Sequence, residues 1–257
     1  MIYIAAHKAF SPPSSKEGYV PLQVGASGKA HLGFITDDTG DNISEKNPYY
    51  CELTGLYWIW KNTSDKYIGL AHYRRYMGKT ELSSSYRKVY DEPALIEFLK
   101  KADIVLPEKE YYKTDAKVEI IEGCTTAEVF DQLRNSVSSV SPDYLKVFDD
   151  FFSQIAASQY NMFFCKREVF EKYCEWLFPI LFDLEKYIDM DKLKGPQKRV
   201  YGYLAERLLN IWVMHNGLKV KYVNTLQMEM KSAEKVNLMR RRITNRIRFA
   251  LKKVVQK

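Results

Sequence analysis

The segment His72-Tyr-Arg-Arg-Tyr76 places an imidazole and two guanidiniums directly after an apolar run. Guanidiniums bind phosphate oxygens through bidentate, charge-assisted hydrogen bonds. Arg74 and Arg75 could therefore hold a diphosphate and neutralise the charge that a leaving nucleoside diphosphate develops in the transition state. The alternative is a solvated strand end whose cations pair with surface acids.

Carboxylates occur in two settings that could support chemistry. Asp37, Asp38 and Asp41 form an acidic group that could bind a divalent cation through hard oxygen ligands or make an Asx-rich turn before the next helix. Glu206 lies beside Arg207 within an apolar helical segment. If buried in a cleft, Glu206 would have a raised pKa and could act as a general base, whereas the other interpretation is a structural Glu–Arg pair.

A predicted alternation of strands and helices carries these residues. Apolar runs predict strands at residues 2–6, 66–71 and 103–106. Helices are predicted between them, at residues 47–62 and 92–101. This order predicts βαβ units and a mainly parallel sheet, in which ligands bind beyond the carboxyl ends of the strands. The side chains predicted at such ends are His7, His72, Arg74 and Arg75.

The second half of the chain is predicted to be more helical. Helices are expected at 128–138, 143–158, 168–187 and 198–216, and strands at 161–165 and 218–223. We find no internal repeat and no linker rich in Pro, Gly or Ser. The 257 residues therefore indicate one large α/β domain.

Composition excludes several classes of protein. With 46% apolar and 28% charged residues, the chain is neither disordered nor a membrane-spanning protein. The four cysteines form no C-x-x-C pair, so neither a structural zinc site nor a disulfide framework is indicated. The start of the chain lacks a basic n-region and a long apolar h-region, which leads us to expect a cytoplasmic protein.

The positive charge is concentrated at the C-terminus. Residues 240–257 carry eight of the basic side chains and no acidic one, so the formal charge of +7 leaves −1 for the rest. The rest of the chain therefore gives no reason to expect a nucleic-acid groove. Apolar residues at helical spacing predict a basic amphipathic helix that lies on an anionic membrane surface. A solvated terminal helix and an RNA-binding tail are the alternatives.

Several familiar catalytic motifs are missing from the sequence. The run Gly25-Ala-Ser-Gly28-Lys29 lacks the spacing and the Ser or Thr of a phosphate loop. No G-x-G-x-x-G, H-E-x-x-H or G-x-S-x-G motif occurs. The sequence therefore does not indicate a dinucleotide dehydrogenase, a metalloprotease or a serine hydrolase.

Taken together, the motifs resemble the family known as domain of unknown function 4422, over nearly all of residues 2–230. They are Ile2-Tyr-Ile-Ala-Ala-His-Lys8, Pro21-Leu-Gln-Val-Gly25, Asp38-Thr-Gly-Asp-Asn-Ile-Ser44, Lys46-Asn47, Tyr50-Cys-Glu-Leu-Thr-Gly-Leu-Tyr-Trp-Ile-Trp-Lys-Asn62, Gly69-Leu-Ala-His-Tyr-Arg-Arg-Tyr76 and Tyr201-Gly-Tyr-Leu-Ala-Glu-Arg-Leu208. Members of this family occur in bacterial capsule, exopolysaccharide and lipopolysaccharide loci and are regarded as glycosyltransferases.

The resemblance implies a GT-A-like fold, that is, one Rossmann-like domain with a mixed, mainly parallel sheet. We expect this domain at residues 1–230 and the basic amphipathic tail at 231–257. The usual GT-A pattern has an Asp-x-Asp metal motif where this chain has His72-Tyr-Arg-Arg75. We therefore expect the arginine pair to replace the metal in holding the donor diphosphate, with no metal ligands assigned and Mn²⁺ or Mg²⁺ dependence as the alternative.

The same resemblance implies roles for individual residues. Tyr3, Ala6 and His7 are expected to line the nucleotide pocket, and Glu206 to deprotonate the acceptor hydroxyl in an inverting displacement. The predicted diphosphate site consists of Arg74 and Arg75, next to His72. The predicted substrate-binding set is completed by Asp38, Asp41 and Asn42.

The function expected from this resemblance is hexosyl transfer, with galactose in pyranose or furanose form as the sugar. The donor is a UDP-sugar, and the acceptor is a lipid-linked surface polysaccharide at the inner face of the cell membrane. The competing hypothesis is a non-catalytic adaptor with a nucleotide-sugar fold in a membrane-associated assembly complex. Nucleic acid is not an expected partner.

Overall fold

The computed structural model describes residues 1–13, 16–81, 83–230, 233, 234, 236–240, 243, 244 and 247. Its strands are β1 (Ile2–Ala6), β2 (Tyr19–Gln23), β3 (Ile35–Thr36), β4 (Tyr67–His72), β5 (Arg75–Gly78), β6 (Ile104–Pro107), β7 (Glu110–Tyr111), β8 (Ala156–Ala157), β9 (Phe163–Lys166) and β10 (Val220–Gln227). Its α-helices are α1 (Asn47–Tyr50), α2 (Leu53–Asn62), α3 (Glu92–Phe98), α4 (Ala116–Gly123), α5 (Ala127–Val140), α6 (Leu145–Phe152), α7 (Arg167–Glu185) and α8 (Val200–His215).

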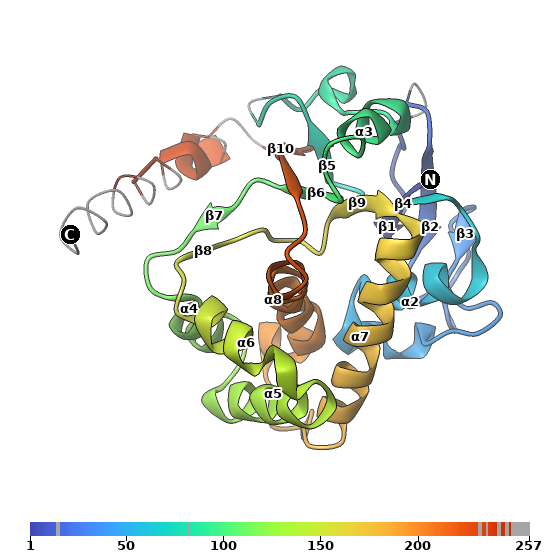
Figure 1. The fold of residues 1–257 in the computed structure, drawn as a ribbon. Coiled ribbons are helices and arrows are strands. Elements are labelled where there is room, and N and C mark those ends of the chain that lie inside the picture. The colour runs from blue at the N-terminus through green and yellow to red at the C-terminus, as the bar shows by residue number, and fades with distance from the viewer. Residues whose placement is uncertain are drawn as a thin grey trace.

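One sheet runs through the middle of the molecule (Figure 1). In the described part of the chain its eight strands have the order β3-β2-β1-β4-β5-β10-β6-β9, and β4 also pairs with β9. Strands β3, β2, β1 and β4 are parallel neighbours. The remaining pairs close β4, β5, β10, β6 and β9 into a ring, in which β6 and β10 are parallel and the other pairs are antiparallel.

The predicted GT-A-like, Rossmann-like architecture with a mainly parallel sheet is therefore wrong. A closed ring of five mostly antiparallel strands stands where an open parallel sheet was expected. The chain reverses directly after β4, where His72 pairs with Arg75 across a tight turn, whereas a parallel partner would need a long crossover. Strand β9 then runs antiparallel to both β4 and β6. Apolar runs predict that strands exist but not in which direction they pair.

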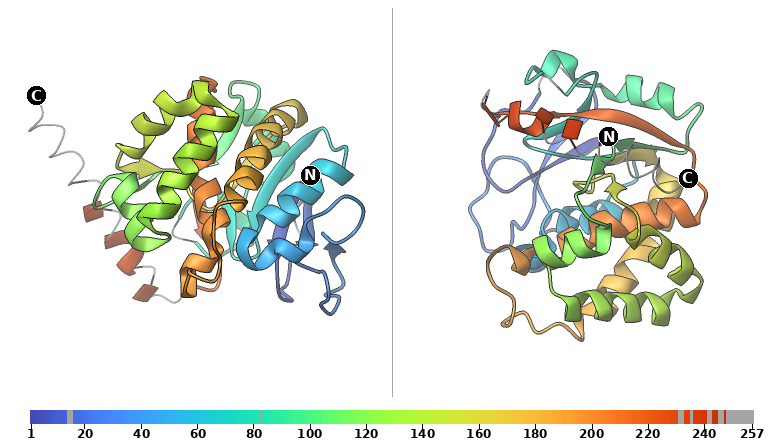
Figure 2. Two further views of the ribbon diagram at one scale, coloured as in Figure 1. Left: turned by 90° about the horizontal axis from the view of Figure 1, so that it is seen from below. Right: turned by 90° about the vertical axis from the view of Figure 1, so that its left-hand side faces the viewer.

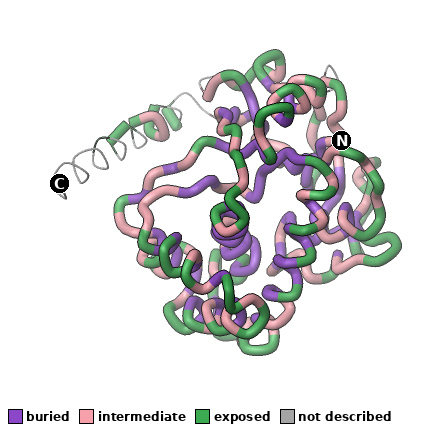
Figure 3. Tube along the Cα trace, viewed as in Figure 1, coloured by how far each residue is buried: buried purple, intermediate pink, exposed green. Residues whose placement is uncertain are grey.

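Helices cover both faces of the sheet. Helices α2, α5, α6, α7 and α8 lie on one side, and α3 lies on the other (Figures 1 and 2). Buried residues concentrate in the strands and along the inner sides of the helices (Figure 3). In α5, for example, Val129, Leu133 and Val137 recur at helical spacing and are buried, and α5 packs against α7. Burial of each such side chain contributes about 1.5–3 kcal/mol to stability.

Several element boundaries differ from the prediction. The expected helix at 47–62 is divided at Cys51, whose φ of +54° interrupts the helical backbone between α1 and α2. The expected helix at 143–158 ends at Phe152, and strand β8 follows. Strands β2, β3 and β5 and helix α4 occupy segments for which no regular element was predicted. Short elements carry too few residues for periodicity to identify them.

The C-terminal tail lies mostly outside the described residues. Residues 236–240 are helical, and Val236 and Ile243 are exposed. The other basic residues of the predicted amphipathic helix are not among the described ones, namely Arg241, Arg242, Arg246, Arg248, Lys252, Lys253 and Lys257.

Candidate functional site

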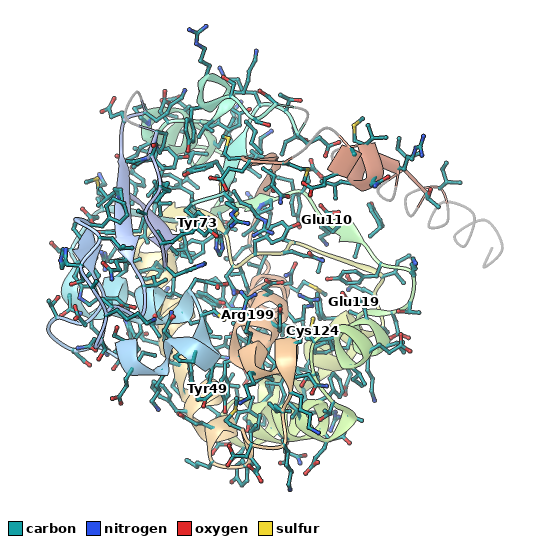
Figure 4. All side chains as sticks on the ribbon, turned by 180° about the vertical axis from the view of Figure 1, so that it is seen from behind. Tyr49, Tyr73, Glu110, Glu119, Cys124 and Arg199 are labelled. Carbon is teal, nitrogen blue, oxygen red and sulfur yellow. The ribbon has the colours of Figure 1, made fainter. Side chains whose placement is uncertain are left out.

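A cavity of about 510 Å³ lies at the carboxyl ends of β1 and β4. Its described lining comes from the end of β1, the residue after β2, helix α1 and the α1–α2 junction, the β4–β5 turn, the residue before α8 and the end of β10. Tyr73 and Arg199 lie across from each other on the back of the molecule, the first near the sheet and the second at the start of α8 (Figure 4). The chain thus builds this cavity, here called the cationic cavity, from segments far apart in the sequence.

Parallel pairing of β1 and β4 explains why four predicted residues meet here. Ala5 is opposite His72 in the register, so His7 emerges from the same edge of the sheet as the β4–β5 turn. His7, His72, Arg74 and Arg75 all line the cavity. The structure thus brings these four side chains together at one cavity, with Arg75 at the start of β5, and their role stays a prediction.

Three guanidiniums give the cationic cavity its charge. Arg74 forms an exposed ion pair in which its Nε lies 3.3 Å from Glu229 Oε2. The Nε of Arg75 is buried without a hydrogen-bond partner among the described residues. Arg199 donates from Nε to Cys51 Sγ at 3.2 Å. Within the described lining, Glu52 is the one carboxylate, so the cavity favours an anion.

A left-handed dipeptide, Tyr160 and Asn161, holds much of this site together. Their φ angles are +75° and +50°, a conformation that Asn tolerates but that costs a Tyr about 1–2 kcal/mol. The Tyr160 carbonyl lies 2.6 Å from His72 Nε2, and the Tyr160 ring lies 4.5 Å from the Arg75 guanidinium carbon. Asn161 Nδ2 donates to Glu52 Oε1 at 2.7 Å and to the Gly202 carbonyl at 3.0 Å. A strained turn that contacts several site residues is typical of functional sites.

His72 is held as a neutral donor. Its Nε2 must carry the proton because the Tyr160 carbonyl can only accept. Burial lowers the pKa of His72, an effect that the nearby Glu52 carboxylate opposes. Burial, followed by the cations Lys8 and Arg74, also lowers the pKa of His7. The positive charge of the cavity near neutral pH therefore comes from the guanidiniums.

Helix α8 approaches this site closely. A Cβ at Gly202 would lie 3.3 Å from the Cys51 side chain, so glycine permits the tight contact between α8 and the α1–α2 junction. This contact brings Glu52 and Arg199 to the same cavity. Burial raises the pKa of the Cys51 thiol to about 11, so Cys51 offers Arg199 a neutral acceptor.

Glu206 does not line the cationic cavity. Its side chain is 14% exposed and accepts from Arg207 Nη1 at 2.8 Å, while Arg207, 2% exposed, also donates to Glu119 at 2.6 Å. Burial raises the pKa of Glu206 to about 7; Glu52 raises it further and Arg207 opposes the shift. The sequence allowed two interpretations of Glu206, a structural Glu–Arg pair and a general base with a raised pKa. The structure shows the ion pair with Arg207 and also a raised pKa.

Two of the predicted nucleotide-pocket residues lie elsewhere. The Tyr3 hydroxyl donates to Asp65 Oδ2 at 2.6 Å, and neither Tyr3 nor Ala6 lines the cavity. Both are buried in β1. Ala5 takes the place expected for Ala6.

The acidic segment after β3 forms a turn that does not line the cavity. Asp37 is buried and accepts from the Gly25 and Ala26 amides at 2.8 and 3.0 Å. Asp38 is exposed, and the exposed Asp41 accepts from Tyr57 Oη at 3.1 Å. Asn42 accepts from the Ser44 amide at 3.2 Å, as in an Asx turn. In the described chain, no group of three His, Cys, Asp or Glu residues is placed to hold a metal.

Sequence reasoning missed Glu52, Asn161 and Arg199. Glu52 falls within the long motif from Tyr50, but nothing in its spacing marks it as a cavity residue. Arg199 directly precedes α8, where the Lys198-Arg199 pair was the available signal. Asn161 has no local signal, because its role depends on a left-handed φ and on partners distant in the sequence.

Comparisons with known proteins identify a family and a related solved structure. Residues 1–217 match the family described as Domain of unknown function (DUF4422). No curated protein matches the chain. The solved structure "WbbM bifunctional glycosytransferase apo structure" is 32% identical with a TM-score of 0.79, and the alignment covers 89% of this chain and 45% of that one. The chain therefore spans less than half the length of that protein, and the similarity indicates a glycosyltransferase-related role.

Every helix in the described part of the chain is too short or too polar to cross a bilayer.

Proposed function

Since the chain belongs to the DUF4422 family, we propose that it is a glycosyltransferase that moves a hexose from a UDP-sugar to a lipid-linked glycan. The observation that carries this proposal is the cationic cavity. Arg74, Arg75 and Arg199 surround one space with Glu52 as its one described carboxylate. The hexose, with galactose to be tested first, and the lipid-linked acceptor rest on the family resemblance.

A leaving UDP requires neutralisation of charge on its diphosphate. Preorganised guanidiniums supply this by donating to the phosphate oxygens, and removal of one such donor typically costs a factor of about 10²–10³ in rate. The buried Nε of Arg75 has no partner among the described residues, and the Arg75 side chain lines the cavity proposed to hold the diphosphate. Because guanidiniums occupy the strand end, we propose that diphosphate binding does not depend on a metal ion.

The proposed transfer is a single inverting displacement. The acceptor hydroxyl oxygen bonds to the anomeric carbon while the bond from that carbon to the diphosphate oxygen breaks, and the electron pair leaves with UDP. A carboxylate takes the acceptor proton. Glu206 has a suitable pKa, about 7, because a general base works best near the operating pH. Glu52 has the more suitable position, since it lines the cavity, so it is the second candidate for this role.

The test measures UDP binding by calorimetry and the slow hydrolysis of a UDP-hexose panel, both with and without EDTA. We expect UDP to bind and one UDP-hexose, UDP-galactose first, to be hydrolysed at the same rate in EDTA. UDP binding without any hydrolysis would favour a non-catalytic adaptor. Strict dependence on Mn²⁺ would contradict the metal-independent part of the proposal.

The proposed location is the inner face of the membrane, through residues 231–257. Each Lys or Arg near an anionic surface contributes about 1 kcal/mol of attraction. Flotation with vesicles that contain phosphatidylglycerol tests this. The full chain is expected to float and a chain that ends at residue 230 is not, whereas equal flotation of both would contradict it.

A further inference from the structure

A second cavity, of about 420 Å³, has Glu119 in its wall, and Glu119 shares the Arg207 guanidinium with Glu206. Strand β7, the following loop and helix α4 line it. Glu110, Glu119 and Cys124 lie together to one side of Arg199 when the molecule is seen from behind (Figure 4). The volume is within the ~300–1,000 Å³ typical of small-molecule sites.

The charge of this second cavity is opposite to that of the first. Glu110, Glu119 and Glu122 line it, against Lys113; the Arg207 guanidinium that pairs with Glu119 is buried. Such a surface repels phosphate groups. The carboxylates are not grouped as metal ligands in the described part of the chain. The suitable ligand is therefore a neutral molecule that can donate several hydrogen bonds.

The polar groups in the wall match a carbohydrate. Carboxylate and amide oxygens accept hydrogen bonds from sugar hydroxyls, and tyrosine rings pack against the apolar faces of sugar rings. Tyr111, Thr114 and Gln159 supply such groups beside the carboxylates. The Tyr112 hydroxyl is buried beside Gln159 and forms no well-aligned hydrogen bond within the described residues.

The position of the second cavity fits an acceptor. Glu119, in its wall, shares Arg207 with Glu206, and Glu206 is close enough to Glu52 for that carboxylate to raise its pKa. Glu52 in turn lines the cationic cavity. Through these contacts Glu206, which lines neither cavity, connects the wall of the cationic cavity with that of the second cavity, and the acceptor hydroxyl must meet the donor sugar between them.

We infer that the second cavity binds the terminal sugar of a neutral glycan acceptor, an inference that rests on the proposed glycosyl transfer. The donor and the acceptor then occupy cavities of opposite charge, on either side of Glu206.

Saturation-transfer NMR with methyl β-galactopyranoside and methyl β-glucopyranoside tests this inference without requiring turnover. We expect at least one of these glycosides to bind, and to remain bound when UDP is added to saturation. No binding of either glycoside, or loss of the glycoside signal on addition of UDP, would overturn the inference. UDP affinity is measured in the same samples, so failure of the donor site is seen separately from failure of the second cavity.

Two variants locate the glycoside. Tyr112→Phe removes only a hydroxyl that lacks a well-aligned protein partner, so the melting temperature should be retained, and the affinity for the glycoside should fall about 2–10-fold. Glu122→Gln should weaken glycoside binding similarly. Glu175→Gln, an identical change on the exposed face of α7, is the matched control. Unchanged glycoside affinity in both cavity variants would overturn the inference.

Discussion

The two cavities differ in the sign of the charge in their walls. The cationic cavity has Arg74, Arg75 and Arg199 around Glu52, whereas the second cavity has three carboxylates and Lys113 in its wall. One side can hold a diphosphate, and the other disfavours it. This difference would orient a nucleotide sugar, with its phosphates among the guanidiniums and its sugar toward the boundary at Glu206.

The largest expected effect concerns that boundary. Glu206→Gln should reduce kcat for transfer by a factor of about 10²–10⁴, because the acceptor proton loses its base, while UDP affinity stays within about twofold. Steady-state kinetics and calorimetry measure the two quantities. Glu52→Gln is compared in parallel. If Glu52→Gln loses kcat and Glu206→Gln does not, the base belongs to the cationic cavity instead of the boundary.

The pH dependence of transfer also tests whether Glu206 is the general base. Since the pKa of Glu206 is raised to about 7, base catalysis should rise with pH through about 7 and then level off, and Glu206→Gln should abolish this rise. The stability effect has the opposite direction. A carboxyl with a raised pKa in the folded state stabilises the fold when protonated, and this contribution is lost as pH rises from about 4.5 through 7. Chemical denaturation across this range measures it.

The next largest effect concerns charge in the cationic cavity. Arg75→Ala should weaken UDP binding about 10–100-fold, because a charge-assisted hydrogen bond contributes about 1.5–3 kcal/mol. Calorimetry measures the loss. Arg134→Ala is the control, since Arg134 is paired with Asp149 at the surface, at 2.8 Å, and lines neither cavity. Equal UDP affinity in the wild type and Arg75→Ala would contradict the role of this guanidinium in binding the diphosphate.

A third prediction concerns the left-handed turn that supports the cationic cavity. Asn161→Gly keeps the positive φ but removes the amide that bonds Glu52 and Gly202. It should lower the free energy of unfolding by about 1–3 kcal/mol. Asn161→Asp should be more damaging because it places a second carboxylate beside Glu52. Urea denaturation of both variants measures the difference, and an unaltered stability of Asn161→Gly would contradict the supporting role.

The smallest effect is the response to salt. UDP affinity should fall severalfold between low and physiological ionic strength, because screening weakens attraction between the anion and the guanidiniums. Glycoside affinity at the second cavity should change little, since the ligand is neutral. Titrations at several NaCl concentrations compare the two slopes. Equal slopes would mean that the charge difference between the cavities does not govern binding.

The sequence placed His7, His72, Arg74 and Arg75 at strand ends, and they lie together in the structure because β1 and β4 are adjacent parallel strands whose following residues meet at one edge. It did not predict the closed ring of strands. Strands β5 and β9 are four residues long, and their antiparallel direction is set by pairing partners and not by composition.

The contacts that hold these residues in place could not be predicted from the sequence either. Cys51 and Asn161 have positive φ angles that depend on tertiary contacts, and neither is a glycine that would mark such a position. Arg199 and Glu52 reach the cavity only because Gly202 lets α8 approach Cys51. Residues that follow a strand can thus be placed from the sequence, whereas residues brought together by helix packing cannot.

Strand β10 has a consequence for how the protein is synthesised. It is inserted between β5 and β6, and its Gln227 pairs with Arg75. Until the ribosome has released residue 227, both flanking strands keep an unpaired edge, which is open to aggregation. Arg75 therefore gains its final backbone partner only after β10 has been synthesised, and a nascent chain should not bind the nucleotide before that moment.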